Sequence, residues 1–260
     1  PEMSQNLDSQ RFYFDVTEPA TETAAGSNGG GSDGGAESGR QASFGASDYD
    51  RLSQRGWEQG RVLGRWIGRH TQPERLFGGE LRRHRETIEA MAEGFGDGLP
   101  EAAVHPGLNE FDHRSVLEAY RPGWGNPEEM ARQLAKEADP RKAFQHAFSE
   151  AIRRWIGGEN EGDYPESWRA FRERVLQGLD EVIRDAGDAK HVFVVTSGGP
   201  ISVVAQSLLD LDDMRAFRLN EVLANASVSR VLFSGDRRSL AVFNSFGHLE
   251  GEDPKLVTYR

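Results

Sequence analysis

The first candidate for chemistry is a serine between a buried strand and a helix. The stretch "HVFVVTSGGPI", residues 191–201, runs from an apolar strand through Ser197, Gly198 and Gly199 to a helix expected to begin at Pro200. In α/β folds the carboxyl ends of strands open onto the ligand crevice, and the next helix offers free N–H groups to an anion. Ser197 and Gly198 are therefore expected to line an anion site.

Two other roles for Ser197 compete with this one. A serine at a strand-to-helix turn is a nucleophile in some hydrolases, and His248 would then be its base. The Gly-x-Ser-x-Gly pattern of that turn is not met, because Val195 stands where the first glycine is needed. A serine that caps the following helix is the commoner arrangement.

Seven histidines offer imidazoles elsewhere in the chain. His70, His84 and His146 fall in or at the ends of expected helices, where we expect them to face solvent or to be satisfied. His113 and His248 are the two that we consider for the rim of a pocket, since His113 lies three residues after Glu110 and His248 follows the last strands.

The elements that must position these residues alternate between strands and helices. "RFYFDV" (11–16) is short, aromatic and alternating, which is typical of a strand. Helices are predicted where apolar residues recur at helical spacing behind capping residues. The expected helices cover 50–70, 80–95, 126–138, 139–158 and 165–187, with Ser53, Asn126 and Asp139 as N-caps and Gly187 at the last C-terminus. Further strands are expected at 227–233 and 239–245, joined as a hairpin.

This order predicts an α/β fold, a three-layer α/β/α sandwich with a mostly parallel sheet, an antiparallel edge strand and a helical insertion. We expect a disordered tail at 1–10 and a single domain over 11–260. Residues 17–40 are rich in glycine, serine and acidic residues and have little to bury, so a disordered insertion is expected there.

Composition excludes several classes of function. The formal charge of −11 argues against nucleic acid or a membrane surface as partner. The absence of cysteine excludes disulfides and sulfur-based metal sites, and we expect neither metal nor cofactor. With no membrane-length apolar stretch and no signal-peptide pattern, a cytoplasmic protein is expected. Exposed edge strands favour a homodimer.

Five stretches in order resemble the histidine phosphatase superfamily, in its phosphoglycerate-mutase-like branch. They are "RQASFGASDYDRLSQRGWEQGRVLG" (40–64), "ELRRHRET" (80–87), "LNEFDH" (108–113), "HVFVVTSGGPI" (191–201), and "NASVSRVLF" with "FNSFGHLE" near the carboxyl terminus. The resemblance covers about residues 40–260 and implies the fold predicted above.

The resemblance also implies roles for particular residues. Arg83 corresponds to a phosphate ligand, Glu110 to the acid that protonates the leaving group, and Ser197 to the second histidine. Arg83 stands between Arg82 and Arg85, so a solvated basic helix face is the alternative.

The nucleophilic histidine of that family has no counterpart. Aligned back without gaps from Gln41, its Arg-His-Gly motif falls on Ser38, Gly39 and Arg40, which leaves Arg40 as a possible phosphate ligand. If 11–16 is the first strand, the motif falls on Asp15, Val16 and Thr17 instead. Neither alignment supplies a histidine.

Loss of a nucleophilic imidazole removes the covalent step on which such catalysis depends. We therefore expect a catalytically degenerate phosphatase, a pseudophosphatase, that binds a phosphorylated small molecule or a protein partner. The alternatives are a residual phosphomonoesterase or phosphoglycerate-mutase-like enzyme with an unusual nucleophile, and a scaffold that uses its acidic segment 17–40 as a flexible arm.

Overall fold

The computed structural model describes residues 10–16 and 50–259. Residues 1–9, most of the predicted tail, lie outside them, as do the predicted insertion at 17–40 and Arg40. The strands are β1 (Gln10–Val16), β2 (Arg75–Gly78), β3 (Ala102–Val104), β4 (His191–Thr196), β5 (Ser227–Ser234) and β6 (Arg237–Ser245). The helices are α2 (Gln54–His70), α3 (Arg82–Phe95), α4 (His113–Tyr120), α5 (Pro127–Leu134), α6 (Pro140–Gly157), α7 (Trp168–Ala186), α8 (Gly198–Leu209), α9 (Asp213–Glu221) and α10 (Gly247–Glu252), with short 3-10 turns at Pro106–Leu108, Glu161–Asp163 and Pro254–Leu256.

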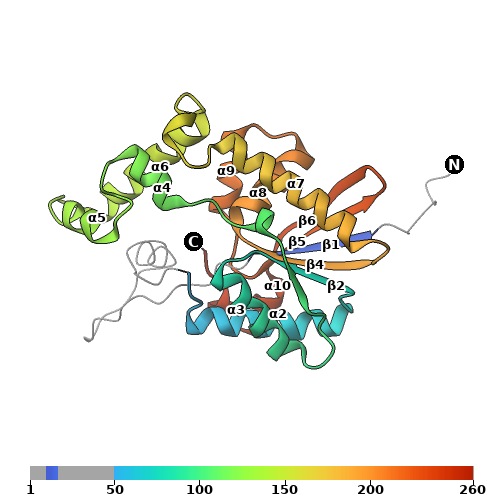
Figure 1. Ribbon diagram of the computed structural model, residues 1–260. Helices are drawn as coiled ribbons and strands as arrows, with labels where there is room; N and C mark the ends of the chain where they lie inside the picture. Colours follow the sequence, from blue (N-terminus) through green and yellow to red (C-terminus); the bar gives the residue numbers. More distant parts are fainter. Residues whose placement is uncertain (1–9, 17–49, 260) are drawn as a thin grey trace, which may run out of the picture.

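The described strands form a six-stranded sheet in the order β3-β2-β4-β1-β5-β6. Strands β1 to β4 run parallel, β5 runs antiparallel to β1, and β6 pairs antiparallel with β5 in the predicted hairpin. Helices α2, α3 and α10 cover one face of the sheet and α7 and α8 the other, while α4, α5 and α6 extend beyond it (Figure 1). The predicted α/β/α class with a helical insertion is confirmed.

Strand β4 shows why its sequence is a continuous apolar run. Val192 and Val194 pack into the core beneath α7 and α8, whereas Phe193 and Val195 pack into the core beneath α2 and α3. A parallel strand with both faces buried has no polar side. The same packing lines up the carboxyl end of β4 beside that of β1, where Val16 pairs with Thr196.

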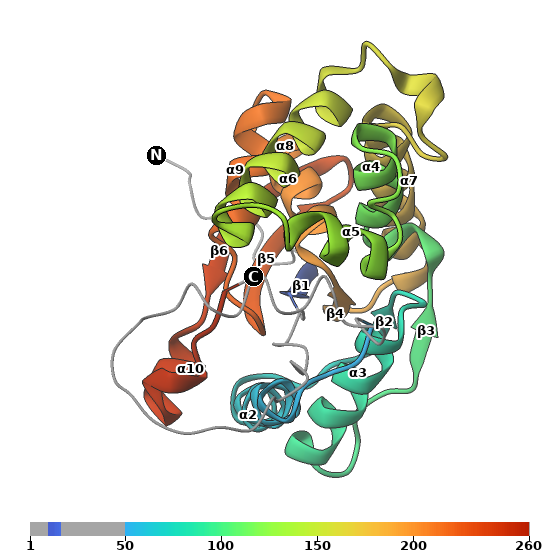
Figure 2. The ribbon, with the colours of Figure 1, turned by 90° about the vertical axis from the view of Figure 1, so that its left-hand side faces the viewer.

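Helices α2 and α3 approach unusually closely, because glycines line their contact. A Cβ added at Gly64 would lie 2.1 Å from the carbonyl oxygen of Met91, and one added at Gly94 would lie 2.0 Å from that of Arg61. Figure 2 shows the two helices side by side beneath the sheet. This close packing seats the carboxyl-terminal half of α3 directly on α2.

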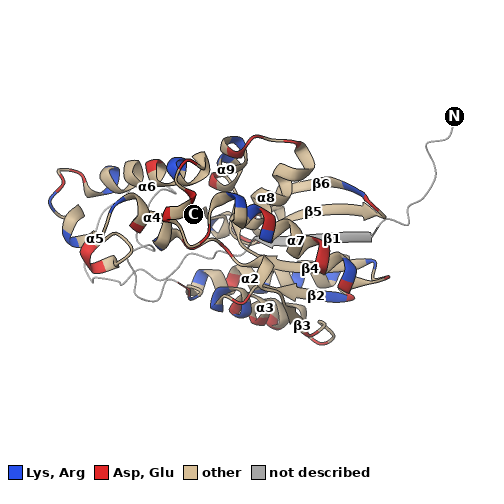
Figure 3. Ribbon diagram, turned by 45° about the horizontal axis from the view of Figure 1, so that its top comes forward, with Lys and Arg blue, Asp and Glu red and all other residues tan. Residues whose placement is uncertain are grey.

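The surface charges of these helices are mixed. Arginines are interspersed with glutamates along α2 and α3 (Figure 3). Several of them pair with one another, as Arg61 does with Glu93 at 2.6 Å between the two helices. The described part of α2 and α3 therefore presents no face of a single sign. No helix within the described residues has the length and apolar character needed to cross a membrane.

Candidate anion site at the start of α8

Ser197 lies between β4 and α8 with its side chain fully buried. It is the N-cap residue of α8 by position, yet its hydroxyl makes no capping hydrogen bond. The capping role predicted for it is therefore wrong, because the hydroxyl is used elsewhere. Its Oγ lies 2.8 Å from Nε2 of His84 and accepts a longer hydrogen bond, 3.4 Å, from an Nη of Arg83.

The two glycines after Ser197 leave space for two neighbouring side chains. A Cβ at Gly198 would lie 2.1 Å from Oδ1 of Asn220, and one at Gly199 would lie 2.0 Å from Oε1 of Glu110. The N–H of Gly199 donates to the other carboxyl oxygen of Glu110 at 3.1 Å. Any side chain at either position would push the neighbouring groups away from the start of the helix.

Arg83 is buried, with 5% of its surface exposed, whereas Arg82 and Arg85 on the same turn are exposed. The alternative of a solvated basic face therefore does not apply to Arg83. One Nη of its guanidinium donates to Oδ1 of Asp50 at 3.0 Å and the other to Ser197. Asp50 also accepts hydrogen bonds from the backbone N–H groups of Arg82 and Arg83, so it caps α3 from 32 residues away.

His84 is the residue of this site that sequence reasoning missed. Its imidazole is fully buried. Burial lowers its pKa well below the ordinary value of 6.5, and the positive charge of Arg83 lowers it further, so the ring is neutral. A signal was present, since His84 lies three residues after Leu81 and four before Ile88, on the apolar stripe of α3.

Glu110 reaches the site from the loop before α4. Its carboxyl accepts hydrogen bonds from the N–H groups of Gly199 and Phe111, each at 3.1 Å. Burial raises its pKa above the ordinary value, and the nearby guanidiniums of Arg83 and Arg174 act in the opposite direction. The carboxyl therefore holds a proton to a higher pH than a solvated glutamate does.

The loop that carries Glu110 is held by neighbouring elements. Arg174 of α7 donates to the carbonyl oxygens of Pro106, Gly107 and Asn109. The hydroxyl of Thr196, the last residue of β4, donates to the carbonyl of Leu108 at 2.5 Å. These bonds bind the loop to the same strand end that carries Ser197.

His113 begins α4 close to this group. Burial lowers its pKa to about 3, so its ring is neutral, and Arg83 contributes to the lowering. His248, the base considered for a serine hydrolase, lies elsewhere: its Nε2 is 2.9 Å from the carbonyl of Ala226 and its ring is tilted against Trp66. The hydrogen bonds of the described residues thus bring His84, not His248, to Ser197.

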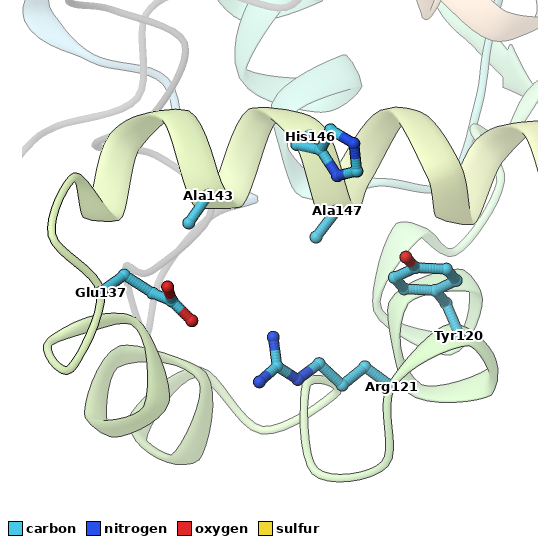
Figure 4. Close-up of a pocket in the computed structure, with 6 residues that line it drawn as sticks. All are labelled: Tyr120, Arg121, Glu137, Ala143, His146 and Ala147. Carbon is cyan, nitrogen blue, oxygen red and sulfur yellow. The ribbon is translucent and has the colours of Figure 1, made fainter.

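A hollow lies in the helical insertion, away from these residues. It has a volume of about 520 Å³ and is lined by Tyr120, Arg121, Glu137, Ala143, His146 and Ala147. Figure 4 shows His146 on α6 and, across the hollow from this helix, Arg121 and Glu137. All three of these side chains are exposed, so water screens their charges. Among the described residues no group of three or more His, Asp and Glu is arranged to hold a metal ion.

The site at the start of α8 brings together most of the predicted residues. Arg83, Glu110, Ser197 and Gly198 meet there, and Arg40 lies outside the described residues. A buried guanidinium beside a helix N-terminus, at the carboxyl end of parallel strands, is an arrangement suited to an anion. The fold is of the α/β class, and the residues at the start of α8 form a candidate anion site within it.

The family follows from a direct comparison. The model of the histidine phosphatase superfamily (branch 1) matches residues 35–245, and the chain belongs to this superfamily. The comparison with curated proteins gave no match.

Solved structures share the fold at low sequence identity. Phosphoglycerate mutase from Bacillus anthracis aligns with a TM-score of 0.59 and 15% identity over 94% of this chain and 97% of its own. A putative alpha-ribazole-5'-P phosphatase from Escherichia coli aligns with a TM-score of 0.60 and 15% identity, over 91% and 97%. The mycobacterial glucosyl-3-phosphoglycerate phosphatase aligns with a TM-score of 0.54 and 20% identity, over 92% and 100%. These structures show that the chain has the phosphoglycerate-mutase-like fold.

Proposed function

We propose that this chain is a catalytically degenerate member of its superfamily that binds a phosphorylated ligand at the start of α8 without turning it over. The observation that carries the proposal is the buried Arg83 guanidinium, hydrogen-bonded to Ser197 beside the first N–H groups of α8. A buried cation and a helix N-terminus both favour an anion, and their electrostatic effects add.

The proposal that turnover is lost rests on the state of His84. A histidine that attacks phosphorus must direct a free ring nitrogen at it. Nε2 of His84 is engaged with Ser197, and Nδ1 lies against Gly79, where an added Cβ would come within 2.2 Å of it. The resemblance places the second histidine of the family at position 197, where this chain has a serine and therefore no imidazole.

A binding and turnover experiment tests this function. Isothermal titration calorimetry with inorganic phosphate, phosphoserine and 3-phosphoglyceric acid is expected to show binding to the wild type. The last two are the compounds bound in structures of the Entamoeba histolytica phosphoserine phosphatase. Arg83→Ala is expected to lose at least tenfold in affinity, because it removes the buried cation. Arg85→Ala, an exposed arginine two residues away, is the matched control and is expected to bind normally.

The same proteins are then assayed with para-nitrophenyl phosphate. The proposal expects no release of nitrophenol above the rate in buffer. Turnover by the wild type that disappears in Arg83→Ala would sink the proposal, as would equal binding of phosphate by both arginine variants. Circular dichroism of each variant establishes that it is folded.

The second candidate is a residual phosphomonoesterase, and the 2.8 Å contact between Ser197 and His84 favours it. In that reaction Oγ of Ser197 bonds to phosphorus while its proton passes to Nε2 of His84, and the protonated Glu110 gives its proton to the leaving alcohol oxygen. The enzyme is left as phosphoserine. Mass spectrometry of the protein after incubation with para-nitrophenyl phosphate discriminates the candidates, since only this one adds a phosphoryl group to the peptide containing Ser197.

Recognition of a protein partner, and a scaffold role for the acidic arm at 17–40, stay predictions. The scaffold role is tested by comparing the proteins captured by the full chain with those captured by a chain lacking 17–40. An unchanged set of partners counts against it.

A further inference from the structure

Asp50 presents a negative charge to the same guanidinium that is proposed to hold the ligand. Its Oδ1 lies 3.0 Å from an Nη of Arg83, and the two side chains form an ion pair. Arg83 exposes 6% of its side chain and Asp50 exposes 39%. The cation is therefore buried, while the carboxylate stands at its outer edge.

The position of Asp50 is fixed by contacts besides the ion pair. Its carboxylate accepts hydrogen bonds from the N–H of Arg82 at 2.7 Å and from that of Arg83 at 3.4 Å. Two residues later, the N–H of Leu52 donates to Glu86 on the next turn of α3 at 2.6 Å. The N-cap residue of α3, Leu81, supplies no side-chain cap of its own. Asp50 therefore stays beside Arg83 because the backbone of α3 holds it there.

An anion bound to Arg83 would come close to this carboxylate. The guanidinium is a small, rigid planar fork, so an anion on another of its edges lies close to Asp50. At such close range charges of the same sign repel, and the repulsion is proportional to the charge of the ligand. A phosphoryl group with two negative charges is penalised twice as much in free energy as one with a single charge.

We propose that Asp50 is a specificity-determining residue that lowers the preference of this site for doubly charged phosphate monoesters relative to singly charged phosphodiesters. This inference rests on the proposed function, because it concerns the ligand of the same site. Asp50 neutralises part of the charge of Arg83 and so weakens binding of every anion, most of all a dianion.

The test compares two ligands of similar shape and different charge. Methyl phosphate is a dianion at about pH 8, well above a second phosphate pKa of about 6, whereas dimethyl phosphate has one charge. Asp50→Asn keeps a carbonyl oxygen to cap α3 and removes the charge. We expect its affinity for dimethyl phosphate to rise about fivefold and that for methyl phosphate about 25-fold, since twice the repulsion squares the factor.

Asp139→Asn is the matched control, because Asp139 also caps a helix with its side chain, at the start of α6. It changes the net charge by the same amount and is expected to leave both affinities within twofold of the wild type. Circular dichroism and thermal unfolding of both variants check the fold.

The outcomes separate this inference from the proposed function. Binding by the wild type with equal gains for the two ligands in Asp50→Asn, or with no gain, overturns the selectivity and leaves the phosphate site standing. If neither ligand binds to the wild type or to Asp50→Asn, the selectivity and the proposed function are both overturned.

Discussion

The site at the start of α8 and the hollow in the helical insertion contain the same kinds of side chain. The first has Arg83, Glu110 and His84, and the second has Arg121, Glu137 and His146. In the first, helices and strands remove the arginine and the histidine from water, and burial shifts the pKa of the glutamate and the histidine. In the second, all three side chains remain exposed. Residue type alone therefore does not make a site, because desolvation decides how strongly charges act.

The close packing behind the first site is the feature whose loss has the largest expected effect. Gly64→Ala places a methyl group 2.1 Å from the backbone oxygen of Met91, which cannot rotate away. Helices α2 and α3 must separate, and we expect a loss of about 3 kcal/mol in the free energy of unfolding.

Gly157→Ala on α6 is the control, since nothing lies within 4 Å of an added Cβ there. Alanine favours helix over glycine, so its stability is expected to stay level or rise by up to about 1 kcal/mol. Urea unfolding measures both variants. Equal effects would mean that the two regions are packed alike.

The buried histidine gives the next largest expected effect. His84→Ala leaves a cavity beside Ser197 and removes a hydrogen-bond partner from its buried hydroxyl. We expect a loss of about 2 kcal/mol, because an unsatisfied buried polar group carries its full desolvation cost. The exposed His146→Ala is expected to stay within about 0.5 kcal/mol of the wild type. Unchanged stability of His84→Ala would contradict the burial of this imidazole against Ser197.

The pH dependence of the free energy of unfolding gives a smaller expected difference between the site at the start of α8 and the hollow in the helical insertion. Folding lowers the pKa of His113 from 6.5 to about 3 and that of His84 in the same direction. Below pH 6.5 the unfolded chain binds protons that the folded chain does not. Their stabilisation is thus complete above pH 6.5 and is lost as the pH falls, in the case of His113 toward 3. Glu110, with its raised pKa, has the opposite sign: its contribution is present at low pH and is lost as the pH rises through the folded pKa.

His113→Gln removes one of these groups. Between pH 6.5 and 5.5 we expect the wild type to lose about 1 kcal/mol more than this variant, measured by urea unfolding at the two pH values. His146→Gln, in the hollow, is expected to follow the wild type. A wild type and a His113→Gln variant with parallel pH profiles would show that His113 is protonated equally in both states.

Local signals in the sequence predicted many elements correctly. The caps at Ser53, Asn126 and Asp139 each accept a backbone N–H of the first helical turn, as expected. Gly187 ends α7 with a positive φ. The strands at 11–16, 227–233 and 239–245, and the apolar strand before Ser197, were also predicted. Strands β2 and β3 were missed, since four and three residues are too few to show a period.

The sequence by itself determined most of the longer elements, the family and the absence of a histidine at position 197. Patterns within a few residues carry this information, because caps, glycine turns and apolar periodicity act locally. Only the tertiary structure decided which side chains meet there. His84 and Arg83 reach Ser197 across more than a hundred residues, and Glu110 reaches Gly199 across 89. These contacts depend on how α3 and the loop before α4 pack against the end of β4. No local pattern in the sequence encodes contacts between residues so far apart in the chain.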